Sequence, residues 1–255
     1  MKTVCIIQAR RQSSRLKNKI LMELNGKPIL QHVVERCSKI KNVDQVIIAA
    51  PDDPYENKVE ELANKLAIKC YRGSMDDVLA RYWGASQIAN SDYIMRVTAD
   101  CPLIDPELCA MLVDQVQSQG MDYGTLDGWP HGLDCEVFTK DMLEEAHKHA
   151  NKAVDREHVT LWIKKQMDAK ILRLVPDDGD YFNSNRWVVD YPEDYEFMKA
   201  VFHFIPENAP YPDWKQILNI TQEHPELKAI NTHCETAWAE KTQEIMEKSN
   251  TQDQV

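Results

Sequence analysis

The amino-acid sequence predicts an α/β fold, in which a mostly parallel, doubly wound sheet is flanked by helices. Two observations support this fold class. Short apolar runs alternate with amphipathic segments over the first 190 residues, as expected when strands are covered by helices on both faces. Beyond residue 191 only helical patterns follow, which predicts a helical extension at the carboxyl end.

Seven apolar runs predict strands, and six amphipathic segments predict helices among them. The strands are expected at residues 3–8, 45–50, 68–71, 93–97, 135–138, 171–175 and 187–189. The helices are expected at 28–39, 55–66, 76–89, 106–118, 140–149 and 155–167. Proline next to acidic residues marks two of the helix starts, at Asp52-Asp53-Pro54 and at Pro106-Glu107.

The last part of the chain carries three further helical patterns, at residues 192–204, 212–221 and 234–247. A length of 255 residues suits one α/β domain. We therefore expect residues 1–255 to form a single domain, within which residues 192–255 act as a helical cover or a dimerisation element.

The glycine content excludes two common nucleotide sites. The chain has eight glycines, and only Gly26 lies in the first seventy residues. Neither the Walker string G-x-x-x-x-G-K-[ST] nor the dinucleotide string G-x-G-x-x-G occurs. A phosphate group bound by this protein must therefore be neutralised by side chains and not by a glycine-rich backbone loop.

Charge and cysteine usage exclude other classes. The net charge of −11 argues against a nucleic-acid binder, because affinity for the phosphate backbone needs a positive field. No apolar run is long enough to span a membrane. The seven cysteines are scattered without C-x-x-C spacing, which predicts reduced thiols in the cytoplasm and gives no sign of zinc.

The first 28 residues have the opposite charge balance. They contain one acid, Glu23, against the basic residues Lys2, Arg10, Arg11, Arg15, Lys17, Lys19 and Lys27. Most of these cations follow the first predicted strand, where ligands bind in open α/β sheets. Guanidinium forks and ammonium groups bind phosphate oxygens well. The segment 8–19 therefore predicts a phosphate-binding loop.

Two aspartates follow later predicted strands. Asp100 comes after the strand at 93–97, and Asp190 comes after the run at 187–189. Magnesium typically takes one or two carboxylates together with substrate phosphates, so both aspartates are candidate metal ligands. Asp190 has an alternative role as a helix cap, and Asp105 fits a cap for the helix beginning at Pro106. Carboxylates, metal and cations together suit phosphoryl or nucleotidyl transfer.

A series of motifs follows in order along the chain. They are I-Q-A-R-x-x-S-S-R-L-x-x-K at 7–19, N-G-K-P-I-L at 25–30, R-G-S-M-D-D-V-L-A-R-Y at 72–82, R-V-T-A-D-C-P-L-I-D at 96–105, G-L-D-C-E-V-F at 132–138, R-E-H-V-T at 156–160 and R-W-V-V-D-Y-P-E-D at 186–194. This series resembles the SpsF-like cytidylyltransferase family, whose relatives include CMP-KDO synthetase and acylneuraminate cytidylyltransferase.

The resemblance implies a nucleotide-diphospho-sugar transferase-like (Rossmann-like) fold. It also implies a Mg²⁺-dependent transfer of the CMP group from CTP to a sugar acid, sugar or related small-molecule acceptor. Pyrophosphate is released, the product serves surface glycan biosynthesis, and a homodimer is expected. Where relatives commonly have a glycine and a proline-glycine pair in the first loop, this chain has Gln12 and Lys17-Asn18.

The resemblance also assigns roles to residues. Catalytic roles would go to Arg10, Lys19, Asp100 and Asp190, with Asp100 and Asp190 as the metal ligands. The nucleotide would contact Ala9, Arg10, Arg15, Lys19, Arg72, Gly73 and Ser74. The acceptor would contact Asp134, Glu136, Arg156 and His158.

Other functions remain open at this point. A nucleotidyltransferase using another nucleoside triphosphate, or a glycosyltransferase, could share the fold. A glycosyltransferase is expected to carry a D-x-D motif, which Asp100-Cys101-Pro102 lacks. A non-catalytic nucleotide-binding protein is the third alternative, and it would have no need for this set of cations and carboxylates.

Overall fold

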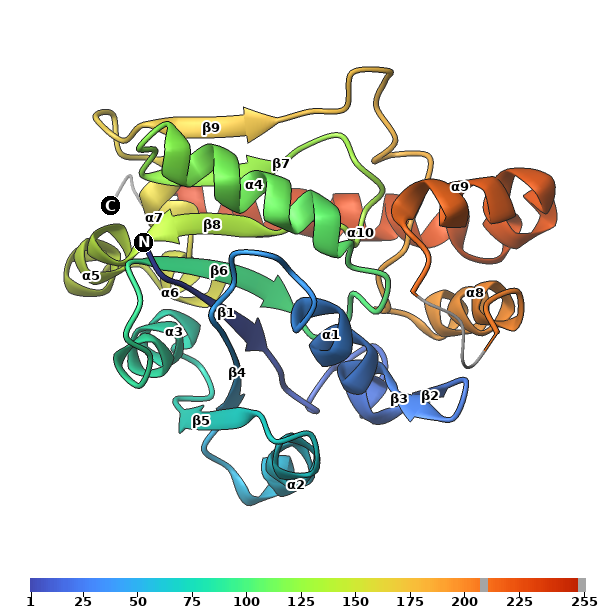
Figure 1. The fold of residues 1–255 in the computed structure, drawn as a ribbon, viewed down its shortest axis with the longest axis horizontal. Coiled ribbons are helices and arrows are strands. Elements are labelled where there is room, and N and C mark those ends of the chain that lie inside the picture. Colours follow the sequence, from blue (N-terminus) through green and yellow to red (C-terminus); the bar gives the residue numbers. More distant parts are fainter. Residues whose placement is uncertain (207–210, 252–255) are drawn as a thin grey trace.

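The computed structural model describes residues 1–206 and 211–251, with side chains described up to residue 244. Seven strands form one sheet (Figure 1). Their order across the sheet is β5 (Lys69–Gly73), β4 (Gln45–Pro51), β1 (Thr3–Gln8), β6 (Tyr93–Thr98), β8 (Glu136–Thr139), β7 (Tyr123–Leu126) and β9 (Ile171–Leu174). Only β8 runs antiparallel to its neighbours among these strands, which confirms the predicted mostly parallel sheet.

Helices α1–α7 flank the sheet, and α8–α10 pack on one another beside it (Figure 1). They are α1 (Ile29–Cys37), α2 (Asn57–Lys65), α3 (Val78–Gln87), α4 (Pro106–Ser118), α5 (Lys140–His149), α6 (Ala153–His158), α7 (Leu161–Lys164), α8 (Pro192–His203), α9 (Trp214–Glu223) and α10 (Pro225–Thr251). Alternate side chains of β1 enter two separate cores, because successive residues of a strand face opposite sides. Cys5 and Ile7 pack with α1, α2 and α4, whereas Val4 and Ile6 pack with α3 and α5.

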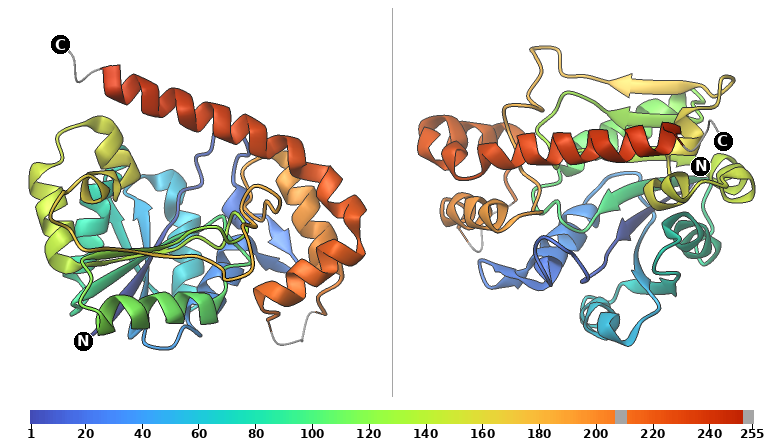
Figure 2. Two further views of the ribbon diagram at one scale, coloured as in Figure 1. Left: turned by 90° about the horizontal axis from the view of Figure 1, so that it is seen from above. Right: turned by 180° about the vertical axis from the view of Figure 1, so that it is seen from behind.

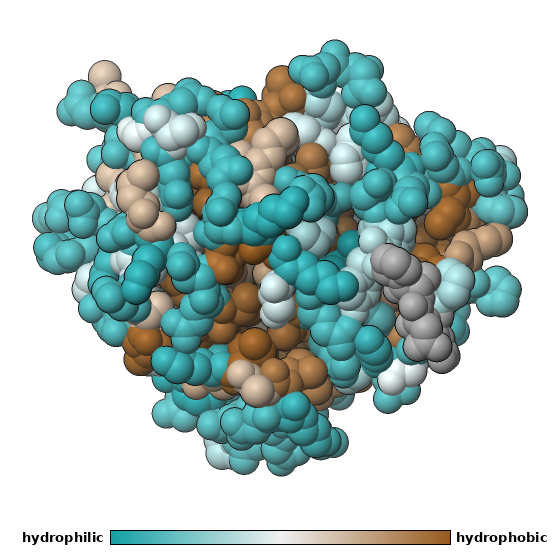
Figure 3. Space-filling model, viewed as in Figure 1, coloured by the Kyte–Doolittle hydropathy of each residue, from teal (hydrophilic) through white to brown (hydrophobic). Residues whose placement is uncertain are grey.

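Two further features of the fold are the hydropathy of its surface and the position of the long last helix, α10. The face drawn in Figure 3 is mostly hydrophilic, with apolar residues visible between the helices near its lower centre. Helix α10 packs on α8 and α9 and runs along the outside of the molecule (Figure 2). Among the described residues, no helix is long and apolar enough to cross a membrane.

Three predicted elements differ from the structure. The run at 187–189 is extended but is not a strand of the sheet. An isolated bridge joins the adjacent Arg186 to His131, and single backbone hydrogen bonds join Trp187 to His131 and Val189 to Asp100. The helix expected at 155–167 is broken into α6 and α7 at Val159, whose φ of 62° is incompatible with a continuing helix. Strand β7 was not predicted, and α10 begins nine residues earlier than expected, at Pro225 and not at 234.

Short polar motifs fix the ends of several elements. Asp105 caps α4 as predicted, since its carboxylate accepts hydrogen bonds from the amides of Glu107 (2.8 Å) and Leu108 (3.1 Å). Between the two-residue strands β2 (Glu23–Leu24) and β3 (Lys27–Pro28), Asn25 and Gly26 have φ values of 45° and 72°. Both lie in the left-handed region, so this is the tight hairpin turn that Asn-Gly favours.

Candidate active site

Two adjoining cavities lie where β1 and β6 end. The first has a volume of about 470 Å³ and is lined by residues of the loop after β1, the end of β6, and helix α10. The second, of about 420 Å³, lies beside β8. Thr98 and Trp238 line both, so the cavities adjoin each other. The carboxyl edge of a parallel sheet is where ligands bind in such folds.

Lys19 joins the two predicted metal ligands at the wall of the first cavity. Its Nζ donates to Asp100 Oδ2 and to Asp190 Oδ1, each at 2.6 Å. The segments that carry the aspartates also meet directly, because the Val189 amide donates to the Asp100 carbonyl oxygen at 2.9 Å. The structure thus brings Lys19, Asp100 and Asp190 together from three distant parts of the chain.

The charges of this cluster are strongly coupled. Burial alone would raise the pKa of Asp190, but Lys19 and Arg15 outweigh burial and lower it. Arg15 Nη2 lies 2.9 Å from Asp190 Oδ1, and its guanidinium stands over the Tyr191 ring. Burial would lower the pKa of Lys19, but the two aspartates raise it. The ammonium and the Asp190 carboxylate therefore stay ionised at neutral pH.

A fully buried carboxylate positions Asp190. Asp194, at the start of α8, accepts two hydrogen bonds from Arg186, at 2.9 and 3.0 Å. It also accepts hydrogen bonds from the backbone amides of Asp190 (3.0 Å) and Tyr191 (2.9 Å). Such bidentate contacts fix orientation as well as charge. The backbone of Asp190 is therefore held by its neighbours before any ligand binds.

The loop after β1 is held in place by hydrogen bonds to Glu56 and within the loop. Both carboxylate oxygens of buried Glu56 accept from the Arg11 amide at 2.9 Å. Asn18 has a φ of 59°, a left-handed conformation that asparagine tolerates. Its Oδ1 accepts from Arg11 Nε (3.1 Å) and the Tyr55 hydroxyl (2.9 Å). Arg11 and Asn18 therefore stabilise the conformation of this loop.

Arg10 contrasts with Arg11. It is exposed, it lines the first cavity, and it has no acidic partner in the described part of the chain. Ser13 and Ser14 line the same cavity. Ala9 lies just beneath the loop, fully buried, with its amide donating to the Ala49 carbonyl oxygen at 3.1 Å. A cation without a carboxylate partner is available to an anionic ligand.

Glu136 organises the second cavity. Its carboxylate accepts from Arg96 (2.6 Å), Tyr123 (2.6 Å) and Thr160 (2.8 Å), and Lys164 Nζ lies 2.6 Å from Oε1. Burial would raise the pKa of Glu136, but Arg96 and Lys164 outweigh it and lower the pKa to about 2. Glu136 is thus a fixed anion that holds two cations at the cavity wall.

Comparison with known proteins identifies the family. A family model described as cytidylyltransferase matches residues 4–225, which is most of the chain. The chain belongs to the cytidylyltransferase family. It is 30% identical over 203 residues to the spore coat polysaccharide biosynthesis protein SpsF of Bacillus subtilis, covering 77% of this chain and 85% of that protein.

Two further relatives cover more of the chain. An uncharacterised protein of Methanocaldococcus jannaschii is 36% identical over 235 residues, which is 91% of this chain and 96% of that protein. The structure of a cytidylyltransferase from Leptospira borgpetersenii superposes with a TM-score of 0.82 at 29% identity, covering 89% of this chain and 96% of that one. The predicted family and enzyme class are confirmed.

The structure does not bring every predicted residue of this cytidylyltransferase to the cavities. Arg72 donates to the carbonyl oxygens of Pro51 (2.8 Å) and Asp53 (2.6 Å), and neither it, Gly73 nor Ser74 lines either cavity. Arg156 pairs with Asp77 at 2.7 Å, donates to the Ala150 carbonyl oxygen at 2.9 Å, and also lines neither cavity. These side chains hold neighbouring loops, because carbonyl and carboxylate groups surround their donors.

The remaining acceptor candidates do line the cavities. His158 lines the first cavity, where burial lowers its pKa, and Asp134 lines the second with Glu136. Sequence reasoning missed Arg96, Lys164, Trp238 and Lys241, which line one or both. Trp238 and Lys241 belong to α10, beyond the residues that the family model matches. No local motif marks them, since only the packing of α10 brings them here.

Proposed function

We propose that this enzyme transfers the CMP group from CTP to a sugar acid, sugar or related acceptor in a Mg²⁺-dependent reaction, for surface glycan biosynthesis. The observation that carries the proposal is the Lys19 ammonium bridging Asp100 and Asp190 beside Arg10 and Arg15 in the first cavity. Membership of the cytidylyltransferase family and similarity to SpsF support the nucleotide and the pathway class.

The triphosphate of CTP is proposed to bind in the first cavity. Arg10, Arg15 and Lys19 provide three cations along one wall, and they offset the charge of the phosphates. An acceptor oxygen forms a bond to the α-phosphorus, and any proton that it carries passes to water. The bond from that phosphorus to the bridging oxygen breaks, and pyrophosphate leaves with the bond's electron pair. Positioning and charge neutralisation account for most of the catalysis in such reactions.

Asp100 and Asp190 fit a divalent cation. An oxygen of each lies 2.6 Å from the same ammonium nitrogen, so the two carboxylates converge on one point. Hard oxygen ligands from one or two carboxylates are what Mg²⁺ prefers, with phosphate oxygens completing its shell. When bound, the cation would add positive charge next to the reacting phosphate.

The acceptor is proposed to bind in the second cavity. Arg96 and Lys164, both held by Glu136, can donate to a carboxylate or to hydroxyl groups, and Asp134 can accept from hydroxyls. The shared wall at Thr98 lets an acceptor oxygen reach the first cavity. His158 is proposed to contact the acceptor from the side of the first cavity.

The assembly is proposed to be a cytoplasmic homodimer of one-domain chains. Free thiols at all seven cysteines support a reducing compartment. The segment 192–255 is proposed to act as the cover, because Trp238 and Lys241 of α10 line the cavities. Residues 207–210 and 252–255 of that segment lie outside the described residues.

The test follows pyrophosphate release with Mg²⁺, each nucleoside triphosphate, and a panel of sugar acids, neutral sugars and phosphorylated sugars. We expect CTP-selective release that needs an acceptor. Asp100→Asn should abolish release while leaving the fold intact, whereas Glu61→Gln, an exposed acid on α2, should not change it. Release with another triphosphate alone, or an active Asp100→Asn enzyme, would overturn the assignment.

A further inference from the structure

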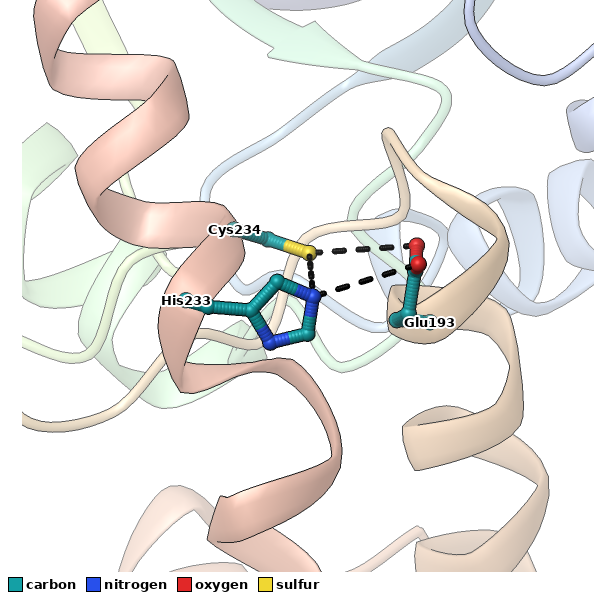
Figure 4. A group of neighbouring side chains, drawn as sticks. All are labelled: Glu193, His233 and Cys234. Atoms are coloured by element: carbon teal, nitrogen blue, oxygen red, sulfur yellow. Dashed lines mark hydrogen bonds and ion pairs between the residues drawn. The ribbon is translucent and has the colours of Figure 1, made fainter.

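Three metal-binding side chains meet where α8 crosses α10, outside both cavities. They are Glu193 on α8 and the neighbouring residues His233 and Cys234 on α10 (Figure 4). Cys234 Sγ lies 3.6 Å from His233 Nε2 and 4.0 Å from Glu193 Oε2. His233 Nε2 lies 3.9 Å from Glu193 Oε1. One atom from each residue therefore faces a common point.

The surrounding packing fixes these positions. Asn231, one turn of α10 before Cys234, donates to Asp194 Oδ1 and to the Arg186 carbonyl oxygen, each at 3.0 Å. Cys234 is only 2% exposed, which leaves its thiol little freedom. Glu193 and His233 are exposed, so an ion can reach the point from solvent. The side-chain hydrogen bond from Asn231 to Asp194 thus joins α10 to α8 next to the cluster.

The geometry does not match a nucleophilic cysteine. In a thiol–imidazole–carboxylate relay, one ring nitrogen faces the thiol and the other faces the carboxylate. Here the same nitrogen, Nε2 of His233, faces both groups. Burial, together with Asp194 and Glu193, also raises the pKa of the Cys234 thiol to about 11, which disfavours a free thiolate. Convergence on one point is what a metal ion needs.

The distances suit zinc. With Zn–S near 2.3 Å and Zn–N or Zn–O near 2.0 Å, tetrahedral ligands lie about 3.3–3.5 Å apart. The observed separations of 3.6, 3.9 and 4.0 Å exceed these by about 0.1–0.6 Å, so Zn²⁺ binding needs only small side-chain movements. A thiolate and an imidazole select zinc over magnesium. A thiolate and a carboxylate also balance the charge of a divalent ion.

We propose that Glu193, His233 and Cys234 bind a zinc ion that joins α8 to α10. The fourth position is left to solvent, as three protein ligands imply. The ion fixes α10, which carries Trp238 and Lys241 to the cavities. The spacing of the cysteines gave no sign of this site, because its ligands come from two elements forty residues apart along the chain.

The test titrates the chelator-treated full-length protein with Zn²⁺ by calorimetry and with Co²⁺ by absorption. The protein carries Asp100→Asn, so that the carboxylate pair in the first cavity does not contribute. We expect one Zn²⁺ per chain and a thiolate-to-cobalt charge-transfer band in the near ultraviolet. Cys234→Ser should abolish the band, and Cys234→Ser and His233→Ala should each weaken Zn²⁺ binding by about 100-fold or more.

Matched controls use the same residue types elsewhere. Cys70→Ser removes a thiol that is more accessible than that of Cys234, and His224→Ala removes another histidine paired with a glutamate. Both should keep the band and the affinity. Zn²⁺ should also raise the Tm of the parent protein but not that of His233→Ala, whose exposed side chain is not needed for folding. Absence of Zn²⁺ binding, or a band that survives Cys234→Ser, would overturn the proposal whether or not the enzyme is active.

Discussion

Replacing Lys19 with methionine tests whether the ammonium stands where the metal binds. Lys19→Met keeps much of the side-chain volume but leaves Asp100 and Asp190 facing each other without the cation. At an effective dielectric constant of about 20, an ion pair at 2.6 Å has a Coulomb energy of about 6 kcal/mol. Desolvation, several kcal/mol for each buried ion, offsets most of it.

The net loss of stability should lie at the lower end of the range for breaking a buried pair, about 3 kcal/mol. Asp190 keeps its contact with Arg15, and the side chain of Asp100 is 20% exposed, so neither carboxylate is left fully unpaired and dry. For a chain of this size, 1 kcal/mol corresponds to about 2–4 °C in Tm. The Tm should therefore fall by about 6–12 °C, and pyrophosphate release should be lost.

Mg²⁺ distinguishes this explanation from a simple packing defect. In Lys19→Met a magnesium ion can occupy the point between the carboxylates without displacing an ammonium, so it should raise the Tm more than it does in the wild type. The assay is thermal unfolding followed by circular dichroism, with and without Mg²⁺. Lys27→Met, which removes a half-buried lysine paired with Glu35 at 2.8 Å, should respond as the wild type does. Equal responses of Lys19→Met and the wild type would refute the reasoning.

Three further predictions concern residues that support the site. Two cations outweigh burial and lower the pKa of Glu136 from 4.5 to about 2. The stability that its carboxylate provides is therefore present above about pH 4.5 and lost as the pH falls toward 2. Acid unfolding should show about 3 kcal/mol of this pH dependence in the wild type and none of it in Glu136→Gln. Gly132→Ala puts a Cβ 2.5 Å from a backbone oxygen at a residue whose φ is 110°, so urea unfolding should show that the free energy of unfolding falls by about 2–4 kcal/mol. Gly120→Ala, where a Cβ meets open space, should lower it by about 1 kcal/mol. Asp194→Asn should cost about 3–5 kcal/mol in the same assay, because Arg186 loses a fully buried partner; a loss below 1 kcal/mol would contradict that role.

The parts of the site that local sequence predicts are those next to strand ends. Asp100 follows the mainly apolar strand at 93–97 and lies two residues before Pro102, so the strand, its end and the carboxylate can all be predicted from a few neighbouring residues. Lys19 is predicted in the same way, from a cluster of cations directly after β1. The sheet edge then brings these residues together, because parallel strands end at the same side.

The parts that local sequence does not predict depend on packing. Lys164 reaches Glu136 only because the chain breaks at Val159, where a β-branched residue takes a φ of 62° that propensity disfavours. Strand β7 contains Gly124, whose missing side chain leaves room for Val116 of α4 and weakens the strand signal. The run at 187–189 has the composition of a strand, but only single backbone hydrogen bonds to His131 and Asp100 join it to neighbouring segments, so no ladder forms.

The guanidinium of Arg186 connects the proposed magnesium site, at Asp100 and Asp190, with helix α10. Arg186 donates to Asp194, which holds the backbone of Asp190, and also to Glu235 of α10 at 3.1 Å. Glu235 also accepts from His131, which packs against Trp238 of the cavity wall. One buried network of contacts therefore links Asp190 with the cavity wall. Groups in one such network are expected to couple energetically, so a displacement of α10 should change the orientation of Asp190. The helix beyond the family match therefore influences the site through Arg186 as well as through the residues it brings to the cavities.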